Sequence, residues 1–168
     1  MKIIHKEFPG VFGKKIIPAD IYWPDSLSLR PKVYIFFHGC CGTVYDHAPT
    51  TYQLLSEQLA KSGAVSIIFE NSRNLQKLDF SPEKFDFQEF TKGAFGGKTF
   101  QQELNDASTA VSSLLAEVKN LLGDKPFSLT FVGFSLGGLM ATLLTTQHAL
   151  DRLFLFGSAA SFQVESDL

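Results

Sequence analysis

The chain has 168 residues, of which 45% are apolar and 19% charged, and its formal net charge is -2. This composition predicts one globular domain with its own core, and the small charge gives no reason to expect nucleic acid or a membrane as partner. No apolar run reaches the ~20 residues that span a bilayer, and the N-terminus lacks the apolar core of a signal peptide. The adjacent Cys40 and Cys41 cannot easily meet disulfide geometry, so we expect thiols and a cytoplasmic protein.

Strands and helices are predicted to alternate along the chain. Six segments have the patterning of strands: 2–8, 15–23, 32–37, 64–69, 127–132 and 151–156. Three segments are predicted helices: 50–62 and 99–122, which begin with capping-box pairs, and 137–148. Because several strands are continuously apolar, the sheet should be covered on both faces. We therefore predict an α/β fold, with a mostly parallel sheet of about six strands and helices on both faces.

The segment Gly133-Phe134-Ser135-Leu136-Gly137 has the pattern G-x-S-x-G. It follows a predicted strand and precedes a predicted helix, which is the context that a nucleophile elbow needs. There the serine hydroxyl projects above the sheet, and the backbone N–H of Leu136 faces a developing oxyanion. A plain glycine-rich turn is the alternative. The spacing of the glycines does not match the G-x-G-x-x-G of a dinucleotide-binding turn.

A second motif, His38-Gly39-Cys40-Cys41-Gly42, follows the predicted strand 32–37. With this motif and the elbow, the whole chain resembles the α/β-hydrolase superfamily, in particular serine esterases, lipases and dienelactone hydrolases. The resemblance implies that the N–H of Cys40 is the other oxyanion donor, with Cys41 the weaker alternative, and that His38 is structural. It implies no metal and no organic cofactor. Thiol catalysis by Cys40 is a minor alternative.

The base and the acid of a serine hydrolase are harder to place. In the family they follow the serine, in the order acid and then histidine, but the one histidine after Ser135 is His148, at the far end of the predicted helix. Asp151 begins the next strand, at the wrong edge of the sheet. Candidates on the correct side are His47 as base and Glu165 or Asp167 as acid.

The family's seventh and eighth strands, which carry the usual acid and histidine, have no counterpart, so we expect a fold truncated after the sixth strand. The last strand, 151–156, is apolar on consecutive positions and should not be left at an open edge. It should pair with a missing C-terminal segment or with a second copy in a homodimer. The segment 71–97 is long for a loop and should face the active site of the single domain 1–168.

These features predict a hydrolase of carboxylic ester, thioester or amide bonds that acts on a small acyl substrate through an acyl-enzyme on Ser135. The isolated chain could be inactive. The alternative is a non-catalytic, hydrolase-like binding or interaction protein that kept the elbow without a complete triad.

Overall fold

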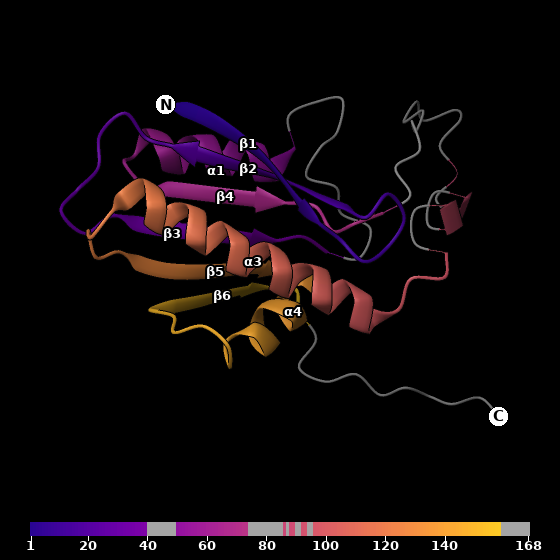
Figure 1. The fold of residues 1–168 in the computed structure, drawn as a ribbon. Helices are drawn as coiled ribbons and strands as arrows, with labels where there is room; N and C mark the ends of the chain where they lie inside the picture. Colours follow the sequence, from indigo (N-terminus) through magenta and orange to yellow (C-terminus); the bar gives the residue numbers. More distant parts are fainter. Residues whose placement is uncertain (40–49, 74–85, 87, 90–91, 94–95, 159–168) are drawn as a thin grey trace.

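A six-stranded sheet organises the computed structural model, which describes residues 1–39, 50–73, 86, 88–89, 92–93 and 96–158 (Figure 1). The strands are β1 (Lys2–Pro9), β2 (Ile16–Trp23), β3 (Lys32–Phe37), β4 (Val65–Phe69), β5 (Ser128–Phe134) and β6 (Arg152–Phe156). Their order is β1-β2-β4-β3-β5-β6. The pairs β1–β2 and β2–β4 are antiparallel, whereas β4, β3, β5 and β6 are parallel neighbours.

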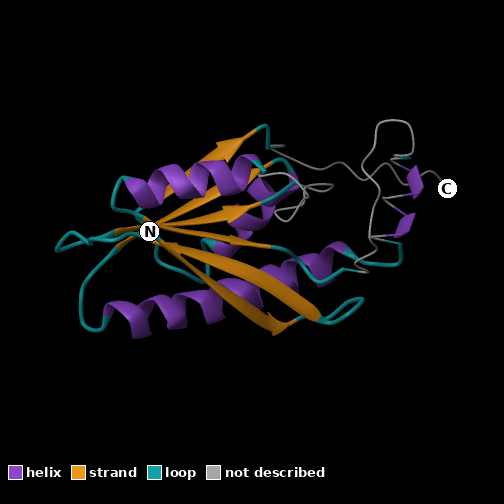
Figure 2. Ribbon diagram, turned by 90° about the horizontal axis from the view of Figure 1, so that it is seen from above, coloured by secondary structure: helices purple, strands orange, loops and turns teal. Residues whose placement is uncertain are grey.

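Helices cover both faces of this sheet. Helix α1 (Thr51–Lys61) packs on one face, and α3 (Phe100–Leu122) and α4 (Leu136–Leu144) pack on the other, as Figure 2 shows for α1 and the long α3. The α3 face holds the larger core, in which Ile35, Phe37 and Phe131 are fully buried. The α1 face holds a smaller cluster around Phe36 and Ile68. This two-layered burial explains why the central strands are apolar on consecutive positions.

The structure confirms the predicted fold class and corrects the end of one helix. The two capping boxes are present, with Thr50 and Thr99 as the N-caps of α1 and α3. Helix α4, however, ends at Leu144 and not near His148. The hydroxyls of Thr145 and Thr146 donate to the carbonyls of Thr142 and Leu143. Such local bonds compete with continued helix, which accounts for the early stop.

Strand β6 is the last strand of the sheet, and three of its side chains are largely exposed. The exposed fractions are 43% for Phe154, 47% for Leu155 and 52% for Phe156. Among the described residues, no strand pairs with its outer edge. Within the same described part, no helix is both long and apolar enough to cross a membrane.

Candidate active site

Ser135 occupies the tight turn between β5 and α4, at the carboxyl end of the parallel strands. It is a non-glycine residue with φ 51° and ψ -121°, a strained backbone conformation. Its N–H donates to the carbonyl of Phe156 at the end of β6 (2.9 Å), and its own carbonyl accepts from the N–H of Gly138 (2.9 Å). The residue is exposed. The turn therefore presents the Ser135 hydroxyl above the sheet while both of its backbone polar groups are bonded.

The glycines of the motif are required by close backbone approach. A Cβ on Gly137 would lie 2.3 Å from the carbonyl oxygen of Phe37 and 2.4 Å from that of His38. A Cβ on Gly133 would lie 2.5 Å from the Cα of Gly138. Helix α4 can thus pack directly on the end of β3, which brings the His38-Gly39 segment to the serine.

Gly39 and Tyr52 border the serine turn from two other parts of the chain. A Cβ built on Gly39 would be 3.3 Å from the Cβ of Ser135, so the loop after β3 begins against the serine. Tyr52 of α1 packs edge-on against Phe134, with ring centroids 5.3 Å apart. Burial raises the pKa of the Tyr52 hydroxyl above its ordinary value; a hydrogen bond from the Gly39 backbone opposes the rise, and the Glu70 carboxylate adds to it. Tyr52 therefore borders the site and holds the start of this loop.

His38, the residue before Gly39, belongs to a buried ionic cluster. Its Nδ1 donates to the carbonyl oxygen of Gly39 (2.8 Å), and its Nε2 is 3.1 Å from Oε1 of Glu70. Arg73 contacts both His38 and Glu70. Its Nη2 is 3.3 Å and 3.4 Å from the two ring nitrogens of His38, and its Nη1 is 3.0 Å from Oε1 of Glu70. All three side chains are at most 4% exposed. Both ring nitrogens of His38 therefore have buried partners.

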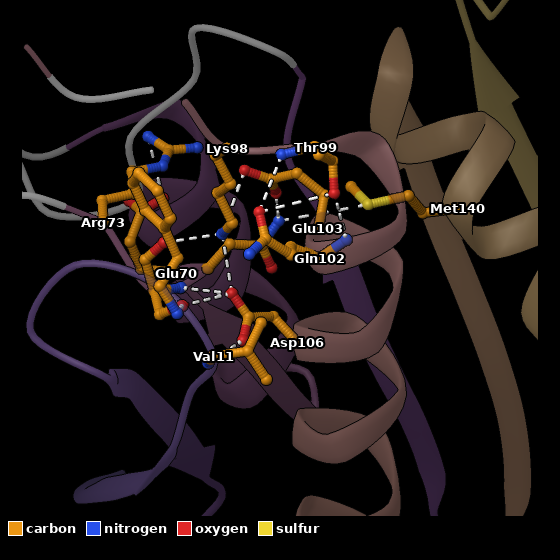
Figure 3. Close-up of polar contacts among 12 residues, drawn as sticks. Val11, Glu70, Arg73, Lys98, Thr99, Gln102, Glu103, Asp106 and Met140 are labelled. Carbon is orange, nitrogen blue, oxygen red and sulfur yellow. Dashed lines mark hydrogen bonds and ion pairs between the residues drawn. The ribbon is translucent and has the colours of Figure 1, made fainter. Parts of the chain in front are cut away.

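A second buried cluster joins three segments beside the first (Figure 3). Lys98 donates to Asp106 (2.6 Å) and to the carbonyl of Ser72 (2.6 Å), and it lies 3.1 Å from Glu103. Asp106 also accepts from the backbone N–H groups of Val11 and Ser72, each at 2.9 Å. The Asp106 carboxylate of α3 thus connects three segments: the β1–β2 turn at Val11, the residues after β4 at Ser72, and Lys98 just before α3.

The remaining predicted residues fall into two groups. Leu136 is the first residue of α4 and half-buried, so its N–H belongs to the unbonded first turn of a helix, beside Ser135. The other predicted residues lie outside the described part of the chain: Cys40, Cys41, His47, Glu165 and Asp167, together with most of the segment 71–97.

Of the two residues that the sequence places away from the serine, Asp151 is distant from Ser135 and His148 contacts β5 at Phe131. Asp151 bonds the N–H of Leu129 (2.9 Å) and pairs with Arg30 (3.1 Å), at the amino end of β5. Six residues of strand separate Leu129 from Ser135, a span of roughly 20 Å. His148 packs against the ring of Phe131, with centroids 6.2 Å apart.

Comparison of the sequence with models of protein families identifies the family of this chain. The model described as lipase (class 3) matches residues 69–164, which is more than half of the chain. The chain belongs to the class 3 lipase family. The matched region contains the end of β4, Glu70 and Arg73 of the first cluster, Lys98, Glu103 and Asp106 of the second, and the Ser135 turn. No curated protein matches the chain.

Solved structures of esterases and lipases share the fold of this class 3 lipase family member at low identity. A carboxyl esterase from Bacillus coagulans has 18% identity and a TM-score of 0.58, covering 92% of this chain and 44% of that chain. A monoglyceride lipase from Saccharomyces cerevisiae gives 18% and 0.59, with 95% and 45% covered. An α/β serine hydrolase without lid from Xanthomonas campestris gives 15% and 0.54, with 99% and 66% covered. The chain therefore spans about half to two thirds of the length of these structures.

The buried ionic side chains around Arg73 and Lys98 are not predicted from the sequence. Asn71, Ser72 and Arg73, the first residues of the predicted loop 71–97, are buried just after β4. A signal was available in α3, where Glu103 and Asp106 fall on the same helical stripe as the apolar core positions. Carboxylates on an apolar stripe indicate buried partners, because an unpaired buried charge is strongly destabilising.

Proposed function

We propose that this protein hydrolyses carboxylic esters through an acyl-enzyme formed on Ser135, with thioesters and amides as weaker candidates. The observation that carries the proposal is the backbone of Ser135. A non-glycine residue at φ 51° is destabilised by about 1–3 kcal/mol, and such strain concentrates at functional sites. The family assignment and the neighbouring Gly39 support the same function.

In the proposed mechanism, the hydroxyl of Ser135 attacks the carbonyl carbon of the ester. The N–H groups of Leu136 and Cys40 stabilise the tetrahedral oxyanion, the alcohol leaves, and water then hydrolyses the acyl-enzyme. His47 is the proposed base, and Glu165 or Asp167 the proposed acid. His38 is not proposed as the base, because both of its ring nitrogens already have buried partners. A small-molecule acyl ester in the cytoplasm is the proposed substrate, and nucleic acid and membranes are not proposed as partners.

Covalent labelling of the serine tests the proposal. A fluorophosphonate probe should label the wild-type protein and the Ser112→Ala variant, but not Ser135→Ala. Ser112 is the matched control because it is also exposed but lies in the ordinary helix α3. Hydrolysis of a short-chain p-nitrophenyl ester should follow the same pattern. A folded wild-type protein that neither reacts with the probe nor turns over the ester would refute the hydrolase and favour the binding protein.

A second pair of variants tests the proposed base. His47→Gln should slow labelling by about 100-fold or more, since general-base catalysis contributes roughly that factor. His5→Gln is the control, because His5 lies on β1 and pairs with Asp20, away from the elbow. Equal labelling rates in the two variants would remove His47 from the mechanism and leave the role of Ser135 intact.

A further inference from the structure

Tyr52, in the first turn of α1, has a side chain that is fixed at the carboxyl end of the sheet. Its ring packs edge-on against Phe36 and Phe134, with centroids 6.5 Å and 5.3 Å apart. These two phenylalanines belong to β3 and β5, which are parallel neighbours. Since Phe134 directly precedes Ser135, the ring of Tyr52 is held next to the serine turn by contacts with both strands.

The hydroxyl of Tyr52 reaches the residue that borders the serine. It accepts a hydrogen bond from the backbone N–H of Gly39. A Cβ at Gly39 would lie 3.3 Å from the Cβ of Ser135 and 3.9 Å from its Oγ. A phenol can donate as well as accept, and no group in the described part of the chain accepts the proton of this hydroxyl. The hydroxyl therefore has a donor to offer beside the serine.

This hydroxyl keeps its proton at neutral pH. Burial raises the pKa of Tyr52 above its ordinary 10.0, the hydrogen bond from Gly39 lowers it, and the charge of Glu70 raises it. A neutral phenol can donate a hydrogen bond to a developing negative charge without changing its own charge. Away from bulk water such a bond is stronger than in solution.

We propose that the Tyr52 hydroxyl is a third donor of the oxyanion hole, beside the N–H groups of Leu136 and Cys40. This inference rests on the ester hydrolysis proposed above. When the Ser135 oxygen bonds to the carbonyl carbon, the π electrons of the C=O bond move to its oxygen, which accepts from the Tyr52 O–H. The serine proton passes to the base and then to the leaving alcohol. When the alcohol leaves, the electron pair returns to the C=O bond, and Tyr52 has kept its proton throughout.

The contact with Gly39 determines the side from which this donor approaches. Gly39 directly precedes Cys40, the proposed oxyanion donor of the loop after β3. The hydroxyl and that N–H therefore belong to the same side of the serine. A purely structural role would use only the oxygen of the hydroxyl, which holds Gly39. The catalytic role also uses its proton, and this difference can be measured.

Removal of the hydroxyl is the first test. Tyr52→Phe keeps the ring contacts and should lower kcat for a p-nitrophenyl ester by about 100-fold, the usual effect of losing one oxyanion donor, with KM little changed. Tyr34→Phe is the control, because Tyr34 is half-buried on the same face of β3, nearer its amino end, and should leave kcat unchanged. Circular dichroism verifies that both variants fold.

The possible failures of this test differ. An active wild type with an equally active Tyr52→Phe variant would exclude Tyr52 and leave the hydrolase intact. A folded wild type that neither hydrolyses the ester nor reacts with the fluorophosphonate probe would refute the hydrolase, and the role of Tyr52 with it.

A more acidic phenol separates the catalytic role from the structural one. 3,5-Difluorotyrosine introduced at position 52 ionises at lower pH than tyrosine. The phenolate still accepts from the Gly39 N–H but has no proton to donate. We therefore expect kcat to fall at a lower pH than in the wild type, whereas the same replacement at position 34 should leave the pH profile unchanged. Identical profiles for the wild type and the protein modified at position 52 would overturn the proposed donor.

Discussion

Gly137→Ala is the substitution whose effect on stability is most directly determined by the structure. Gly137 is the second residue of α4, where alanine is intrinsically favoured over glycine by up to about 1 kcal/mol. The added methyl group would meet the carbonyl oxygens of Phe37 and His38 at 2.3 Å and 2.4 Å. These are backbone atoms, which cannot move aside by a change of rotamer.

The magnitude follows from the displacement that this contact requires. To reach an ordinary contact of roughly 3.4 Å, the start of α4 must move by about 1 Å. Overpacking of this kind lowers the free energy of unfolding by about 1–3 kcal/mol, or roughly 2–10 °C in Tm for a domain of this size. Since the same movement displaces Ser135, the labelling rate should fall by about 100-fold.

Urea unfolding followed by circular dichroism, together with fluorophosphonate labelling, measures both effects. Gly123→Ala is the control, because Gly123 has φ 62° but no atom within 4 Å of its Cβ position. We expect a loss of about 1–3 kcal/mol there, from backbone conformation alone, and no change in labelling. A Gly137→Ala variant as stable as the wild type would show that α4 does not pack on the end of β3 as described.

Three further predictions follow from buried and strained groups. Lys98→Met removes the cation from two buried carboxylates and should lower the free energy of unfolding by about 3–5 kcal/mol; Lys61→Met, at an exposed helix pair, should change it by less than about 1 kcal/mol in the same urea titration. Ser135→Gly should abolish labelling yet raise Tm, because glycine tolerates φ 51° without strain; an unchanged or lower Tm would contradict the strain argument. Burial, and then the charge of Lys119, lower the pKa of His148 below its ordinary 6.5. Since the unfolded chain then binds the proton more tightly, stability should be complete above pH 6.5 and fall as the pH drops below it; His148→Gln should weaken this pH dependence, and an identical slope would exclude His148 as its source.

Much of the fold could be predicted from local patterns because the determining interactions are local. Threonine and glutamine three residues apart are enough to begin α1 and α3, and both capping boxes are present. The end of α4 could not be predicted in this way. The hydroxyls of Thr145 and Thr146 compete for its last carbonyls, and the apolar periodicity does not report that competition.

The candidate site likewise has one part that the sequence predicts and one part that it does not. The G-x-S-x-G pattern predicts a turn at Ser135, and the structure places a strained serine there. The support beneath it comes from residues separated by 32 to 35 positions, such as His38 with Glu70 and Arg73. Such contacts cannot be predicted from a short sequence pattern, because their residues are far apart in the chain and each one taken alone resembles an ordinary loop or helix-surface residue.

The sequence by itself therefore determined the fold class, the position of the serine turn and the apolar character of β6, because periodicity and short motifs are properties of neighbouring residues. Only the tertiary structure decided the strand order, the approach of Gly39 to Ser135 and the pairing of Lys98 with Asp106. Those depend on which surfaces meet when buried charges must find partners and α4 must pack on β3. They also place Phe156 both on the last strand of the described sheet and against the backbone of Ser135.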